Sequence, residues 1–75
     1  MAVNVHVLIR IGAGKVWEAC ETVSQIKGVK SANVVTGPYD VIVYAELPSP
    51  EDMRHLMEAI HNVEGVIRTE TCVAL

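Results

Sequence analysis

The sequence predicts a single α+β domain whose four strands and two helices follow the order β-α-β-β-α-β. Residues 3–11 alternate in polarity, as a strand with one buried face does. Two later segments carry apolar residues at helical spacing, and each is followed by a glycine, a valine and a strand-like run ("IKGVKSANVV" and "VEGVIRTETCV"). This repeated pattern is typical of the ferredoxin-like βαββαβ fold, in which both helices cover one face of a four-stranded antiparallel sheet.

The first half begins with a strand over residues 3–11 and continues with a helix. One face of the strand carries Val3, Val5, Val7, Ile9 and Ile11. The helix is predicted within "GAGKVWEACETVSQIKG", and its apolar stripe consists of Val16, Ala19, Cys20, Val23 and Ile26. Lys27 suits the negative end of the helix dipole, and Gly28 suits the C-terminal cap. Trp17 lies one position off the stripe, so we expect it to cover the edge of the helix–sheet contact.

The second half begins with two strands, "VKSANVVT" and "YDVIVYAEL", which a Gly-Pro turn joins into a predicted hairpin. The segment "PSPEDMRHLMEAIHNVEG" predicts the second helix, with Ser49 as N-cap and Pro50 in the first turn. Gly65 ends this helix, and "VIRTETCVAL" is the fourth predicted strand.

The sheet face away from the helices is predicted to be too apolar for full exposure. Leu8, Ile42 and Tyr44 lie on it, and His6 lies on the same face of the first strand. A domain of 75 residues has a marginal core. We therefore expect a second copy to pack against this face, sheet against sheet, as in a dimeric α/β-barrel assembly.

Composition narrows the class of protein. The formal net charge of -3 and the scattered Lys and Arg residues argue against sequence-independent binding to nucleic acid. No apolar run is long enough to cross a bilayer, and the N-terminus lacks the features of a signal peptide. Two cysteines make no disulfide framework, and no Cys/His cluster predicts a metal site. A soluble cytoplasmic protein with reduced thiols and without cofactors is the simplest interpretation.

Four stretches, in this order, resemble a known family: "VLIRIGAGK", "IKGVKSANVVTGPYDVIVYAEL", "MEAIHNVEGV" and "RTETCVAL". The chain resembles, over nearly its whole length (residues 1–75), the regulation-of-amino-acid-metabolism (RAM) domain. This domain is the effector-binding part of the leucine-responsive, AsnC-type (Lrp/AsnC) transcription regulators. The Gly-x-Tyr-Asp turn at residues 37–40 is the most specific element of the match.

The resemblance implies partners as well as a fold. Members of this family dimerise through their sheets and assemble further into rings, so we expect a dimer, an octamer or a decamer. Full-length members carry an N-terminal helix-turn-helix domain that contacts DNA. This sequence begins at the first strand of the effector domain. We therefore expect no direct DNA binding, and transcriptional regulation only through full-length regulators of the same family.

The resemblance places Gly37, Pro38, Tyr39 and Asp40 in an effector loop that binds a small molecule, usually an amino acid. Gly37 permits close approach of the backbone or a positive φ, and Pro38 stiffens the loop. The Asp40 carboxylate either accepts a hydrogen bond from a ligand ammonium or caps the backbone of its own loop. The residues alone leave both roles open.

Thr69 and Thr71 share one face of the fourth strand, which in the family lies beside the effector loop. A hydroxyl both donates and accepts, which suits the carboxylate and ammonium of an amino acid. Ordinary β-propensity explains the same threonines without a ligand. Met53 is a further candidate for the pocket, with a place in the core as the alternative.

Two other function classes remain open from the residues. Face-to-face dimers of this fold also occur in cofactor-free monooxygenases and isomerases, and His6, Asp40 and Tyr44 fit an acid–base role there. Such enzymes have cavities rich in aromatic residues, whereas this sequence has two Tyr, one Trp and no Phe. A purely structural oligomerisation module is the other alternative. We therefore predict a non-enzymatic amino-acid sensor.

Overall fold

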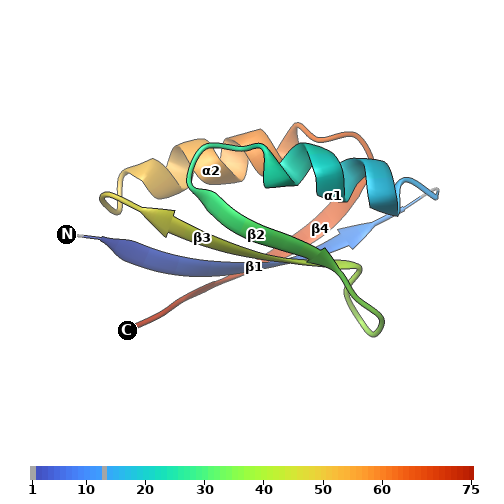
Figure 1. Ribbon diagram of the computed structural model, residues 1–75, viewed down its shortest axis with the longest axis horizontal. Helices are drawn as coiled ribbons and strands as arrows, with labels where there is room; N and C mark the ends of the chain where they lie inside the picture. The colour runs from blue at the N-terminus through green and yellow to red at the C-terminus, as the bar shows by residue number, and fades with distance from the viewer. Residues whose placement is uncertain (1, 13) are drawn as a thin grey trace.

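The computed structural model describes residues 2–12 and 14–75, so Met1 and Ala13 lie outside the described residues. Its elements are β1 (Val3–Ile11), α1 (Val16–Ser24), β2 (Val29–Val34), β3 (Val41–Leu47), α2 (Asp52–His61) and β4 (Val66–Val73). The strands form one antiparallel sheet in the order β2-β3-β1-β4, and both helices lie on one face of it (Figure 1). The predicted α+β, ferredoxin-like βαββαβ fold is confirmed.

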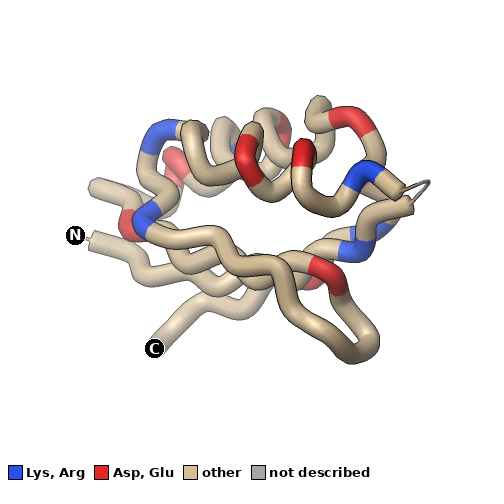
Figure 2. The backbone as a smooth tube through the Cα atoms, turned by 45° about the vertical axis from the view of Figure 1, so that its right-hand side comes forward, with Lys and Arg blue, Asp and Glu red and all other residues tan. Residues whose placement is uncertain are grey.

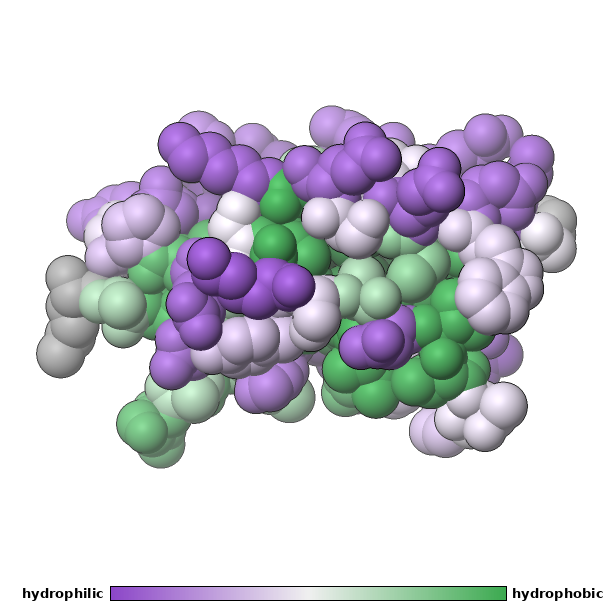
Figure 3. Space-filling view, viewed as in Figure 1, coloured by the Kyte–Doolittle hydropathy of each residue, from purple (hydrophilic) through white to green (hydrophobic). Residues whose placement is uncertain are grey.

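Strand alternation creates the core, as the sequence predicts. Val5, Val7 and Ile9 of β1 pair with Ala45, Val43 and Val41 of β3, and all six side chains are buried against the helices. The helices contribute four further buried residues to the same cluster: Ala19, Val23, Leu56 and Ile60. Hydrophilic side chains cover the outer surface of the helices, with hydrophobic ones between this layer and the sheet (Figure 3).

Helix α1 is shorter than its apolar stripe predicts. It ends at Ser24, because the chain tightens into i→i+3 hydrogen bonds from Gln25 to Thr22 and from Ile26 to Val23. Lys27 therefore lies in the following turn and not in the last turn of the helix. The expectation for Trp17 is wrong, since its side chain is 73% exposed.

The start of α2 also differs from the prediction. Glu51 occupies the N-cap position, and Ser49 lies two residues earlier. The Ser49 hydroxyl and amide both donate to Asp52 Oδ2, at 3.0 and 3.2 Å. Asp52 thus caps the turn that leads into the helix, as in the second half of a capping box.

Both helix-to-strand junctions require glycine for the same reason. Gly28 and Gly65 have φ values of 95° and 96°, in the left-handed region. A Cβ on Gly28 would lie 2.7 Å from Leu47 Cδ2, and one on Gly65 would lie 2.9 Å from Lys15 Cβ. These glycines let the helices turn back closely onto the sheet.

The open sheet face combines apolar and charged side chains. Leu8 pairs with Ile42, whose side chain is 37% exposed, and the His6 ring lies 5.1 Å from the Tyr44 ring. At one end of this face Arg10 pairs with Arg68. Acidic residues are frequent on both helices (Figure 2). Neither α1 nor α2 is long and apolar enough to span a membrane.

Candidate functional site

The loop between β2 and β3 is held by backbone hydrogen bonds at its base. The Val35 amide donates to the Asp40 carbonyl, and the Asp40 amide donates to the Ile9 carbonyl, both at 2.9 Å. Gly37 has a φ of 124°, which other residues rarely adopt, and no atom outside its immediate neighbours lies within 4 Å of where its Cβ would be. The glycine therefore serves the backbone conformation of an exposed turn and not a close packing contact within the chain.

The Asp40 carboxylate has a partner within the chain. Its Oδ2 accepts a hydrogen bond from the Ile11 amide at 2.8 Å, in a half-buried position. Ile11 ends β1 at the point where the β1–β4 register shifts. The donor thus belongs to β1 and not to the loop itself. Asp40 Oδ1 makes no hydrogen bond with the residues that the structure describes.

Side chains of the open face also contact the loop at Pro38 and Tyr39. Arg10 Nη1 donates to the Pro38 carbonyl at 3.1 Å. A hydrogen bond to the Glu70 carboxylate raises the pKa of the Tyr39 phenol, and Glu70 also accepts from Arg68 Nη2 at 3.2 Å. These contacts link the loop to β1 and β4, so strand β4 lies beside it.

The two threonines of β4 point toward the helices and away from the open face. Thr69 and Thr71 pair with Ile9 and Val7, whose side chains face the helices. Thr69 Oγ1 and His61 Nε2 share a hydrogen bond of 3.0 Å, and Thr71 Oγ1 donates to Met57 Sδ at 3.4 Å. Met57 and His61 were not predicted for this site; their i, i+4 spacing on α2 is the signal that could have indicated them.

The seven predicted site residues therefore form two groups within one chain. Gly37, Pro38, Tyr39 and Asp40 make up the loop, which contacts the open face through Arg10 and Glu70. Thr69 and Thr71 lie on the helix side of β4, and Met53 is half-buried against the core. The chain by itself does not bring these groups together.

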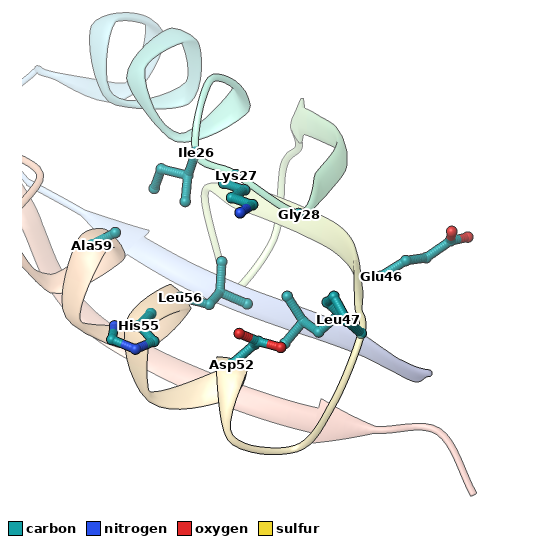
Figure 4. Close-up of a pocket in the computed structure, with 10 residues that line it drawn as sticks. Ile26, Lys27, Gly28, Glu46, Leu47, Asp52, His55, Leu56 and Ala59 are labelled. Atoms are coloured by element: carbon teal, nitrogen blue, oxygen red, sulfur yellow. The ribbon is translucent and has the colours of Figure 1, made fainter. Parts of the chain in front are cut away.

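A groove lies at the other end of β3, and none of the seven residues lines it. This groove has a volume of about 780 Å³ between α2, the α1–β2 turn and the end of β3 (Figure 4). Its lining consists of Ile26, Lys27, Gly28, Glu46, Leu47, Pro48, Asp52, His55, Leu56 and Ala59. The sequence gives no motif for it, because its residues come from three separate segments.

The cysteines and acidic residues form no further chemical centre in the described part of the chain. Cys20 and Cys72 are free thiols, and burial raises the pKa of Cys20. Among residues 2–12 and 14–75, no group of three His, Cys, Asp or Glu side chains is placed to hold a metal ion.

Residues 4–75 match the family model of the Lrp/AsnC ligand-binding domain. The chain is 37% identical over 67 residues to an uncharacterised HTH-type transcriptional regulator of Pyrococcus furiosus. This match covers 89% of the chain and 45% of the regulator, so the chain spans about half the length of the curated relatives it matches.

The fold is also similar to solved structures. The protein TTHA0845 of Thermus thermophilus superposes with a TM-score of 0.92 at 32% identity, over 97% of this chain and 92% of that one. A transcriptional regulator of Neisseria meningitidis, solved as a complex with L-Met, has a TM-score of 0.84 at 18% identity, over 97% and 49%. The second likeness concerns the fold alone. With the family model matching almost every residue, this chain belongs to the Lrp/AsnC ligand-binding domain family.

Proposed function

We propose that the chain is a homo-oligomeric sensor of a small amino acid, and that its effector site is shared between subunits. The observation that carries this proposal is the division of the site residues into two groups on opposite sides of the sheet. The loop at residues 37–40 contacts the open face, whereas Thr69 and Thr71 lie on the helix side. A ligand that needs both groups has to bind where two copies meet.

The loop is suited to a ligand with an ammonium group. Asp40 Oδ2 is used by the Ile11 amide, which fixes the carboxylate and leaves Oδ1 for a further donor. Thr69 and Thr71 from a second copy supply hydroxyls that both donate and accept. The complex of a structurally similar regulator with L-Met supports an amino acid as the ligand class.

Self-association rests on the open face of the sheet. Leu8 and Ile42 lie side by side there, flanked by the His6–Tyr44 ring pair. Covering this face with a second copy removes apolar surface from water, at about 25 cal/mol per Å². Mass action then links assembly to the effector, since a ligand that bridges subunits stabilises the oligomer.

A binding role fits the side chains better than catalysis. Within residues 2–12 and 14–75, no polar or charged side chain is fully buried, and His6 and Tyr44 of the enzyme alternative lie on the open face. Catalytic acids and bases depend on desolvation or on close charges to shift their pKa values. We therefore infer a non-enzymatic cytoplasmic regulator that acts by ligand-dependent assembly or by joining full-length regulators of its family.

The test is a thermal-shift screen of the twenty amino acids, followed by light scattering with each hit. We expect a small subset to raise the melting temperature and to increase the fraction of the largest oligomer. Asp40→Asn should lower the affinity for the amino acid that the screen identifies by about one to two orders of magnitude, and Glu21→Gln serves as a surface control. A monomer at micromolar concentration, or an unchanged affinity in Asp40→Asn, would contradict the shared site.

Binding to DNA is tested separately by gel shift at physiological salt. The net charge of -3 and the acidic surface of the helices lead us to expect no shift with duplex DNA. Salt-sensitive binding at nanomolar concentration would overturn the assignment of DNA contact to a partner.

A further inference from the structure

The groove at the end of β3 has an apolar floor and a defined position. Its floor is formed by Ile26, Leu47, Leu56 and Ala59, which come from the α1–β2 turn, β3 and α2. Its volume of about 780 Å³ lies within the range of small-molecule pockets, roughly 300–1,000 Å³. Asp40 lies just before the first residue of β3, and Leu47, which lines the groove, is the last residue of that strand. The groove is therefore about 20 Å from the effector loop along the strand.

Two side chains of opposite charge flank this floor. Lys27 and Asp52 lie on either side of Leu56 in the close-up, and the Glu46 side chain points away from the groove (Figure 4). Glu46 is engaged elsewhere, because its Oε2 accepts from the Tyr44 hydroxyl at 2.9 Å on the open face. The groove thus offers one cation and one anion across an aliphatic surface.

Each of the two charges is available to a ligand. Asp52 is held in place by Ser49, whose amide and hydroxyl both donate to Oδ2 and leave Oδ1 free of hydrogen bonds to the described residues. Lys27 takes part in no salt bridge with the part of the chain that the structure describes. A carboxylate fixed by its neighbours loses less side-chain entropy when a ligand binds.

We propose that this groove is a second ligand site, which takes a small zwitterion with an aliphatic body. The ligand ammonium pairs with Asp52 Oδ1, its carboxylate pairs with Lys27 Nζ, and its aliphatic chain covers the half-buried Ile26 and Ala59, since Leu47 and Leu56 are already buried within the chain. A compound with only one charge leaves either Lys27 or Asp52 without its partner. This site goes beyond the shared effector site proposed above, because it lies within one chain and at the opposite end of β3.

The experiment maps ligand-induced amide shifts in ¹⁵N-labelled full chain by NMR, with L-leucine as the probe. Two analogues each remove one charge: 4-methylpentanoate lacks the ammonium, and 3-methylbutylamine lacks the carboxylate. We expect L-leucine to shift the amides of Gly28, Leu47 and Ala59 in a saturable manner. Both analogues should bind at least about threefold more weakly, as expected for the loss of one partly screened ion pair.

Two variants identify the groups responsible. Lys27→Gln should weaken the binding of L-leucine, measured at these amides, by about two- to fivefold. Lys30→Gln removes the same charge from an exposed position in β2 and should leave the affinity unchanged. Ala59→Leu should abolish the shifts by filling the groove. Thermal melts establish whether each variant folds. If Ala59→Leu does not fold, Lys27→Gln still tests the proposal.

The outcomes separate this site from the effector loop. Shifts at Gly28, Leu47 and Ala59 that depend on Lys27 and persist in Asp40→Asn support the groove. Shifts confined to residues 37–40 and 69–71, with no effect of Lys27→Gln, overturn the groove and leave the effector loop standing. Equal binding of L-leucine and 4-methylpentanoate at the groove overturns the zwitterion assignment.

Discussion

The two faces of the sheet are built from alternate residues of the same strands, yet they differ in what completes them. On the helix side, Val5, Val7 and Ile9 are fully buried by elements of the same chain. On the open side, Leu8 and Ile42 lie side by side next to the His6–Tyr44 pair and remain partly exposed. The first face is completed when the chain folds, and in the proposed oligomer the second is completed when another copy covers it. On this proposal the sheet separates folding from assembly, and single substitutions on either face test this separation.

The largest effect is expected on the covered face. Leu56→Ala removes a core side chain that is only 2% exposed. The lost contacts and the remaining cavity should lower the free energy of unfolding by about 2–5 kcal/mol. Urea denaturation followed by circular dichroism measures this loss. Ile42→Ala is the matched control on the open face, and a comparable loss of monomer stability in that variant would contradict the separation.

On the open face, Ile42→Glu should act on assembly and not on folding. Burying a carboxylate in an apolar contact without a partner is costly, and each subunit of a symmetric dimer carries the substitution. We expect the dissociation constant to rise by at least about tenfold, or about 1.4 kcal/mol. Light scattering over a dilution series measures it. An unchanged oligomer would show that another surface holds the copies together.

A local effect is expected where the loop at residues 37–40 joins the sheet. Asp40→Ala removes the acceptor of the Ile11 amide and should cost about 1–3 kcal/mol of stability. Hydrogen exchange should show faster exchange at Ile11 in this variant, whereas Val7 in the centre of β1 should keep its protection. Unchanged exchange at Ile11 would mean that Asp40 does not hold the loop in solution.

The smallest effect concerns the tyrosines of the open side. Hydrogen bonds to Glu46 and Glu70 raise the pKa values of Tyr44 and Tyr39 above that of an unfolded chain, which is about 10. Their contribution to stability is present below pH 10 and is lost as the pH rises through the folded-state pKa values. Tyr44→Phe should therefore reduce the loss of melting temperature between about pH 9 and pH 11. A loss equal to that of the wild type would contradict the link.

Periodicity was sufficient to predict the fold. The alternation of Val3 to Ile11 and the helical stripes define which residues meet in the core, and the junction glycines mark where the helices end. The ends of the helices were less accurate, because local hydrogen bonds decide them. Ser24 donates to the Glu21 carbonyl, and Asp52 caps the Ser49 amide; neither contact follows from the apolar pattern.

The candidate site was only partly predictable, since side-chain direction across strands depends on register. The sequence indicated the Gly37–Asp40 turn, and the expectation that β4 lies beside it agrees with the Tyr39–Glu70 contact. The β4 residue that faces the loop is Glu70, and not Thr69 or Thr71. A shift of one residue in the register of β4 would turn the threonines toward the loop instead. The groove was missed because Lys27 and Asp52 become neighbours only through tertiary packing.

The central place of β1 in the sheet has a consequence for how the chain acquires its structure. Both partners of this first strand come later in the sequence: β3 begins at Val41, and β4 begins at Val66. During synthesis β1 therefore emerges before either of its partners. β3 can pair with one edge once Leu47 has been made, whereas the other edge stays unpaired until β4 follows. Such non-local pairing slows folding and exposes apolar strands to aggregation. The β2–β3 hairpin, which is local and complete by Leu47, is the natural template on which β1 first docks.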